Sequence, residues 1–139
     1  MTQTEANKQL VRRYVEEMWN QGRLAAAADF LAPDYRRHMG DRALDAQGQM
    51  QRIAGMRAAF PDLRMEIRDL LAEGDRVAMH LRMTGTQQAA FLGVTPSGRS
   101  VAMTAVDVLR IADGRIVEHW GAADMLGLMQ QMGSLPKPA

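Results

Sequence analysis

The sequence of 139 residues contains no cysteine, which excludes disulfide bonds, thiol catalysis and thiolate metal sites. Neither sign of charge dominates: 17 Lys and Arg stand against 16 Asp and Glu, and a net charge of +1 does not indicate a nucleic-acid partner. No apolar run approaches the roughly 20 residues of a membrane span, and the polar N-terminus predicts no signal peptide. We therefore expect a cytoplasmic protein with no nucleic-acid and no membrane partner.

Aromatic residues are also scarce, at 5% of the chain, whereas 12 residues are methionine. Methionine is flexible and polarisable, so it suits an interior that adapts its shape to a ligand. The length fits one domain with enough core to enclose a small cavity. We expect a single domain over residues 1–139, with flexible ends at about 1–4 and 134–139.

Apolar residues recur first with the period of a helix and later with the period of a strand. Four helices are predicted: 5–19, 24–31, one that begins after Asp45 as its N-cap and ends at Phe60, and 125–132. The last helix would begin at Asp124 as its N-cap and end at Gly133. Alternating residues predict strands from the end of the third helix to residue 123. Helices followed by antiparallel strands indicate an α+β fold, with helices on one face of a bent sheet.

Asp107 interrupts an otherwise apolar stripe along the predicted strand 101–111. A buried carboxylate is costly unless it is paired or protonated, so Asp107 is either bonded or functional. If residues 112–114 form a three-residue loop, Asp107 lies opposite His119 and the two share the inner face. With a two-residue turn, Asp107 would face Trp120 instead. A satisfied ion pair in the core is the structural alternative to a catalytic pair.

Three further polar residues allow both a structural and a catalytic interpretation. Tyr14 lies on the inner side of the first helix, where its hydroxyl needs a partner. His38 follows the second helix and faces either solvent or a pocket. Helix capping explains Asp124 as well as acid–base catalysis does. The three histidines have no metal-ligand spacing, and no glycine-rich phosphate loop occurs, so we expect no metal and no cofactor.

Five blocks of the sequence carry a family resemblance: FPDL (60–63), AEGDRVAMHLRMTGT (72–86), FLGVTPSGR (91–99), VDVLRIADGRIVEHW (106–120) and ADMLGLMQQMG (123–133). In order and spacing they resemble the SnoaL-like polyketide cyclases, and the resemblance covers most of the chain. It implies the cone-shaped fold shared with nuclear transport factor 2, ketosteroid isomerase and scytalone dehydratase. In that fold three N-terminal helices close one end of a curved antiparallel sheet around an apolar pocket.

The same resemblance implies roles for several residues. Tyr14 after Arg13 is similar to the helix-borne tyrosine of ketosteroid isomerase, and Asp107 to its oxyanion-hole aspartate. His38 stands where that enzyme has its general-base aspartate. In the polyketide cyclases a carboxylate near the end of the last strand acts as acid and base in an aldol closure, and Asp124 is its best match.

These residues predict cofactor-free proton transfer beside a carbonyl group, completed by aldol-type cyclisation of a small apolar, polyketide-like ligand. His38 or Asp124 would take the proton. Asp107 and His119, as a coupled pair, would bind the enolate, to which Tyr14 could also donate. Six apolar residues are predicted to contact the substrate: Trp19, Met56, Phe60, Met79, Met103 and Trp120.

Other functions fit the same scaffold. An isomerase or a dehydratase would use similar acid–base groups, and a small-molecule binding module would use the pocket without chemistry. An epoxide hydrolase would need an inward-facing arginine between two aspartates, which the sequence pattern does not single out.

The outer face of the predicted sheet is less polar than a solvated surface usually is. Its small and apolar members are Ala78, Ala102, Thr104, Val106, Val108 and Trp120. Arg110 and Glu118 would pair on this face as an ordinary exposed ion pair. Together with the family resemblance, this surface predicts a homodimer.

Overall fold

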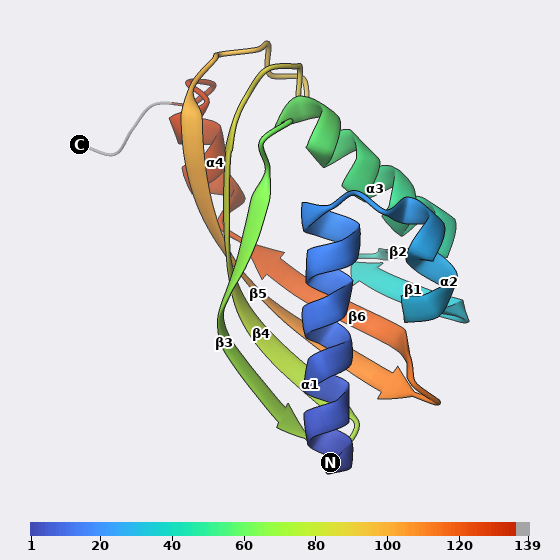
Figure 1. Cartoon of the computed structure of the whole chain (residues 1–139). Helices are drawn as coiled ribbons and strands as arrows, with labels where there is room; N and C mark the ends of the chain where they lie inside the picture. Colours follow the sequence, from blue (N-terminus) through green and yellow to red (C-terminus); the bar gives the residue numbers. More distant parts are fainter. Residues whose placement is uncertain (136–139) are drawn as a thin grey trace.

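The computed structural model describes residues 1–135 and has an α+β fold, as predicted (Figure 1). The helical segments are α1 (Gln3–Tyr14), the π-helical η1 (Val15–Asn20), the 3-10 turn η2 (Leu24–Ala26), α2 (Ala27–Phe30), α3 (Ala46–Ala59) and α4 (Met125–Gln131). The strands are β1 (Leu31–Met39), β2 (Arg42–Leu44), β3 (Arg64–Glu73), β4 (Arg76–Thr86), β5 (Ser100–Ala112) and β6 (Arg115–Ala123). The part of the expected flexible end at 136–139 lies outside the described residues.

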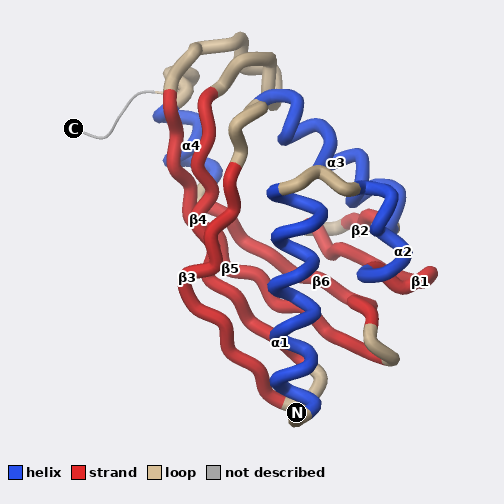
Figure 2. The backbone as a smooth tube through the Cα atoms, viewed as in Figure 1, coloured by secondary structure: helices blue, strands red, loops and turns tan. Residues whose placement is uncertain are grey.

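The strands form one curved, unclosed sheet in the order β2-β1-β6-β5-β4-β3 (Figure 2). Neighbouring strands are antiparallel except β1 and β6, which run parallel, so the sheet is mixed rather than wholly antiparallel. Hairpins join β3 to β4 and β5 to β6, which makes those pairs antiparallel. β1 instead comes from the helical region and pairs with a strand far along the chain, so no hairpin fixes its direction.

The helices lie where the periodicity predicts them. Thr2 caps α1: its side-chain hydroxyl accepts a hydrogen bond from the Glu5 backbone N–H. The Glu5 carboxylate in turn accepts a hydrogen bond from the Thr2 backbone N–H. α1 and η1 together bury Val11, Tyr14 and Met18 completely. Helices α1 to α3 pack on one face of the sheet (Figure 2), and the core fills the space between. No helix within residues 1–135 is long and apolar enough to cross a membrane.

The β5–β6 hairpin differs from the predicted three-residue loop. Ala112 pairs with Arg115, so only Asp113 and Gly114 form the turn. Both turn residues have positive φ, 50° and 73°, which is typical of the tight turns that match the twist of two-stranded hairpins. The prediction of a third loop residue is therefore wrong.

A register shift between Arg110 and Ile111 then changes the pairing further along the hairpin. Asp107 lies opposite Gly121, rather than opposite His119 or Trp120. The predicted meeting of Asp107 with His119 nevertheless occurs, because the two are diagonal neighbours on the same inner face. Both side chains are buried.

Candidate active site

A cavity of about 720 Å³ lies between α3, β1 and the ends of β5 and β6. Its apolar lining consists of Met39, Leu44, Met56, Phe91, Leu92, Met103 and Met125. Three arginines, Arg37, Arg42 and Arg52, also line it. Such a space, mostly apolar with a few placed polar groups, is typical of small-molecule sites. In the part of the chain that is described, no three His, Asp or Glu side chains are grouped to hold a metal ion.

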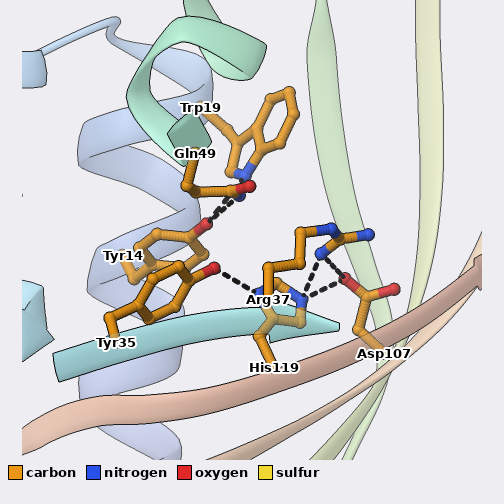
Figure 3. A network of polar contacts seen from close by, with 7 residues as sticks. All are labelled: Tyr14, Trp19, Tyr35, Arg37, Gln49, Asp107 and His119. Carbon is orange, nitrogen blue, oxygen red and sulfur yellow. Dashed lines mark hydrogen bonds and ion pairs between the residues drawn. The ribbon is translucent and has the colours of Figure 1, made fainter. Parts of the chain in front are cut away.

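At the inner end of this cavity Arg37, Asp107 and His119 meet (Figure 3). His119 Nε2 lies 2.7 Å from Asp107 Oδ2, which confirms that the two groups are in contact. Arg37 Nη1 lies 2.8 Å from the same histidine nitrogen and 3.7 Å from Asp107 Oδ2. Arg37 points inward because it follows Tyr35 by two residues on β1, and alternate side chains share a face.

The surroundings of His119 and Asp107 set the protonation state of each side chain. Burial lowers the pKa of His119, and the positive charges of Arg37 and Arg52 lower it further against the opposing effect of Asp107. Burial alone would raise the pKa of Asp107, but the hydrogen bond with His119 and the charge of Arg37 hold it below its ordinary value. At pH 7 the carboxylate is therefore ionised and the imidazole neutral.

These charges assign the imidazole proton. An ionised carboxylate can only accept, so we assign the His119 proton to Nε2, which donates it to Asp107. Arg37 Nη1 is itself a donor, so its 2.8 Å contact with the protonated Nε2 is not a hydrogen bond. The Nδ1 atom is then the acceptor for the Tyr35 hydroxyl, which lies 3.1 Å away. Both ring nitrogens are thus occupied, and His119 orients Asp107 rather than facing the cavity itself.

The network approaches one wall of the cavity closely because residue 121 is glycine. A Cβ atom on Gly121 would lie 2.6 Å from Asp107 Oδ1 and 2.8 Å from Arg37 Nη2. Gly121 and Arg37 both line the cavity. A hydrogen-bond acceptor and a hydrogen-bond donor therefore reach the same wall, so this wall can receive a proton on one atom and bind an oxygen with the other.

Tyr14 lies beside the network and is fully buried. Its hydroxyl oxygen accepts hydrogen bonds from Gln49 Nε2 at 2.9 Å and from Trp19 Nε1 at 3.3 Å. Burial raises the pKa of Tyr14, so the hydroxyl stays protonated. The ring centroids of Tyr14 and His119 are 6.5 Å apart, edge to face. Tyr14 thus supports the inner end of the cavity without being part of its lining.

The apolar residues predicted to contact the substrate separate into three groups. Met56 and Met103 line the cavity. Trp19 is buried next to Tyr14, and Phe60 and Met79 lie in the hydrophobic core. The sixth, Trp120, lies on the opposite face of the sheet.

His38 also lies on that outer face, because it alternates with the inward Arg37. Its ring stacks on Trp120 at 5.1 Å, and its Nε2 lies 3.0 Å from Glu118 Oε2. Glu118 also accepts a 2.7 Å hydrogen bond from Arg110 Nε, which confirms the predicted outer ion pair. His38 therefore does not reach the cavity in this structure.

Asp124 is exposed and caps α4, where its Oδ1 accepts a 2.9 Å hydrogen bond from the Gly127 N–H. The predicted N-cap is confirmed. Ala123 and Met125, on either side of it in the sequence, line the cavity. Asp124 itself is not among the residues that line the cavity, and it makes no contact with the Arg37 network in the described part of the chain.

The sequence patterns do not predict the arginines of the cavity, among them Arg37 and Arg52. The signal for Arg37 is its position two residues after the aromatic Tyr35, because alternate residues of an extended segment share a face. For Arg52 the signal is helical spacing, because it lies three residues after the buried Gln49 and four before the buried Met56.

The match to known proteins agrees with this geometry. The family model of the SnoaL-like polyketide cyclases matches residues 9–132. The chain belongs to the SnoaL-like polyketide cyclase family. The resemblance seen in the five sequence blocks is thereby confirmed, and so is the fold that it implied.

Individual SnoaL-like relatives share about a third of the sequence or less. The nogalonic acid methyl ester cyclase of Streptomyces nogalater is 27% identical over 124 residues, which cover 83% of this chain and 89% of the relative. The structure of AclR from Streptomyces galilaeus, a suggested hydroxylase, has a TM-score of 0.89 at 33% identity, covering 98% of this chain and 90% of that one. TsrD from Streptomyces laurentii has a TM-score of 0.88 at 27% identity, covering 97% and 100%.

Proposed function

We propose that this SnoaL-like protein catalyses cofactor-free proton transfer at a carbon beside a carbonyl group, followed by intramolecular aldol-type ring closure. The substrate would be a small, largely apolar, polyketide-like molecule. The observation that carries this proposal is the Gly121 wall, where Asp107 Oδ1 and Arg37 Nη2 lie side by side at the end of an apolar cavity. The name of the Streptomyces nogalater relative, a cyclase, supports ring closure as the second step.

In the first step Asp107 Oδ1 takes the proton, and the C–H electron pair moves onto the carbonyl oxygen to give an enolate. Arg37 Nη2 donates a hydrogen bond to that oxygen as its negative charge develops. In the second step the enolate carbon attacks a second carbonyl carbon of the same molecule and forms a C–C bond. The new alkoxide takes back the proton from Asp107, so no atom and no electron is gained or lost.

The low pKa of Asp107 limits the carbon acids that it can use. A weak base removes protons efficiently only from an acidic carbon, such as a methylene flanked by two carbonyl groups. Holding both reacting groups of one molecule in the cavity supplies the remaining advantage for ring closure. His119 acts as a positioning residue, because its Nε2–H fixes Asp107 Oδ2 and leaves Oδ1 facing the wall.

Asp124 is the second candidate for the base, since the family resemblance points to it and its sequence neighbours Ala123 and Met125 line the cavity. The two carboxylates differ in burial: Asp107 is 7% exposed, whereas Asp124 is exposed and already bonded to the Gly127 N–H. A base that is shielded from water acts with stronger electrostatic support. We therefore favour Asp107.

Exchange of carbon-bound hydrogen in D2O tests the first step without the natural substrate. The probe is 2-tetralone, an apolar two-ring ketone with an acidic methylene, followed by proton NMR. The wild-type protein should accelerate exchange over buffer, and Asp107→Asn should lower the enzymatic rate about 10²- to 10⁴-fold. Asp124→Asn, which removes the carboxylate of the α4 cap and keeps the cap, is the matched control and should retain the rate.

Two results would contradict the proposal. If Asp124→Asn abolished exchange while Asp107→Asn retained it, the base would be Asp124. If 2-tetralone bound to the wild-type protein without any exchange, the binding-module interpretation would be favoured over proton transfer.

A further inference from the structure

Arg52 is a half-buried cation on the cavity side of α3 with no acidic partner. It lines the cavity, and its guanidinium lies over the Trp19 ring at 5.5 Å. Within residues 1–135 no hydrogen bond or ion pair satisfies it. The other arginine that faces inward from α3, Arg57, is by contrast bonded to the backbone oxygens of Trp19 and Asn20.

The network next to Arg52 does not neutralise its charge. Asp107 is shared by Arg37 and His119. Because His119 is neutral, the positive charge of Arg37 and the negative charge of Asp107 balance each other. The positive charge of Arg52 is then left without a counter-charge. Arg37 itself is 6% exposed, and its Nε has no hydrogen-bond partner in the described residues. Arg37, Arg52, Asp107 and His119 together thus carry one net positive charge, to which the exposed Arg42 of the lining adds a second, and Arg37 Nε is an unused N–H donor.

Burying a charge without a partner is costly, and an anion bound in the cavity would remove this cost. Guanidinium groups match the carboxylate geometry with two parallel hydrogen bonds. The rest of the cavity is lined mainly by apolar residues, Met56 and Met103 among them, and so excludes a strongly polar molecule. The site therefore fits an apolar body that carries one anionic group.

We propose that the natural substrate carries a free carboxylate and that Arg52 pairs with it. This inference rests on the proposed function for the reactive end of the substrate, which lies at the Gly121 wall. The carboxylate would hold the molecule at α3, so that its enolisable carbon meets Asp107. The name of the Streptomyces nogalater relative indicates a methyl ester, a group without charge that would leave Arg52 unpaired.

Binding of an acid and its own ester tests this proposal without any turnover. The probes are anthraquinone-2-carboxylate and its methyl ester, titrated calorimetrically into the wild-type protein and into Arg52→Gln and Arg52→Lys. The wild-type protein should bind the acid about tenfold or more tightly than the ester, as a charge-assisted hydrogen bond would give. Arg52→Gln should bring the ratio near one, and Arg52→Lys should restore part of it.

Arg12→Gln is the matched control, because Arg12 is an exposed arginine on α1 and its loss changes the net charge equally. It should leave the ratio unchanged. The proposal is overturned if the wild-type protein binds the ester as tightly as the acid, if Arg52→Gln keeps the preference, or if neither probe binds. If 2-tetralone exchange fails, the ratio of acid binding to ester binding can still be measured. If that ratio is one, the proposal of proton transfer is not affected. The two proposals can therefore be rejected independently.

Discussion

Gly121 lies directly opposite Asp107 across β6 and β5, and the absent side chain leaves room for the carboxylate directly behind the glycine that lines the cavity. Gly121→Ala would place a methyl group 2.6 Å from Asp107 Oδ1, so the carboxylate or Arg37 must shift. We expect at least a tenfold loss of 2-tetralone exchange, because small displacements of reacting groups are costly. The far-ultraviolet circular dichroism should stay that of the wild-type protein.

An unchanged exchange rate in Gly121→Ala would contradict the role of this wall. Reduced exchange together with lost secondary structure would not be informative, so the melting temperature is measured in parallel. The variant Gly121→Ser extends the series, since its larger side chain should lower the rate further than alanine does.

Acidification should destabilise the protein through His119. Its pKa is lowered in the folded state, whereas in the unfolded chain a histidine titrates near 6.5. Below about pH 6.5 the unfolded state therefore binds a proton that the folded state does not. The stabilising contribution is complete above this pH and is lost as the pH falls toward the folded pKa of His119. The slope is at most about 1.4 kcal/mol per pH unit.

Urea denaturation between pH 7.5 and 5 measures this slope. His119→Gln should remove most of it, even though the variant is less stable overall. His80→Gln is the control, because the His80 side chain is 41% exposed. If the free energy of unfolding of the two variants depended on pH with the same slope, the assignment of a buried, neutral His119 would be wrong.

Asp107 and Arg37 should be strongly coupled in folding. Asp107→Asn leaves the buried Arg37 without its counter-charge, at a cost of about 3 kcal/mol or more in the free energy of unfolding. The double variant Arg37→Gln/Asp107→Asn should lose less than the sum of the two single variants. Denaturation of all four proteins in urea gives the coupling energy.

The outer ion pair provides the comparison. Glu118 and Arg110 are each about a third exposed, with side-chain exposures of 30% and 32%. Glu118→Gln should therefore cost less than about 1 kcal/mol. Equal losses for Glu118→Gln and Asp107→Asn would argue against a dry, charge-paired network at the inner end of the cavity.

The helices and strands can be predicted from the sequence because apolar periodicity and helix caps are local features. Asp45 and Asp124 were both predicted as N-caps, and both accept the expected backbone hydrogen bond, at 2.8 and 2.9 Å. The register of the β5–β6 hairpin cannot be predicted, because nothing in the local sequence pattern marks the shift between Arg110 and Ile111. Asp107 and His119 still meet, since a shared face needs only the correct alternation.

The cavity arginines could not be predicted in the same way. An arginine in a strand normally lies on the surface and is buried only when it is paired with a counter-charge. Its burial can therefore be predicted only when that counter-charge is known. For Arg37 that counter-charge is Asp107, which the parallel pairing of β1 with β6 brings close. This pairing joins segments from opposite ends of the chain and leaves no short-range pattern. The same long-range packing decides that Tyr35 meets His119.

The cap at Asp124 can be separated from catalysis by two substitutions. Asparagine caps helices about as well as aspartate, so Asp124→Asn should be nearly neutral for stability. Asp124→Ala should cost about 1 kcal/mol, because the Gly127 N–H loses its acceptor. Thermal denaturation checks both values. If Asp124→Asn were as destabilising as Asp124→Ala, the charge of Asp124 would matter to the fold beyond the cap.

The outer face of the sheet leads us to propose a homodimer. On this face Val106 is 54% exposed, and Trp120, which lies opposite Val108, is stacked on His38. A residue near the axis of a two-fold interface faces its own copy, so if the axis passes close to Val106, one substitution there introduces two like charges. Val106→Glu should therefore yield monomers, whereas the similarly shaped but uncharged Val106→Thr should remain dimeric. Sedimentation equilibrium at micromolar concentration gives the mass, and a monomeric wild-type protein would exclude this arrangement.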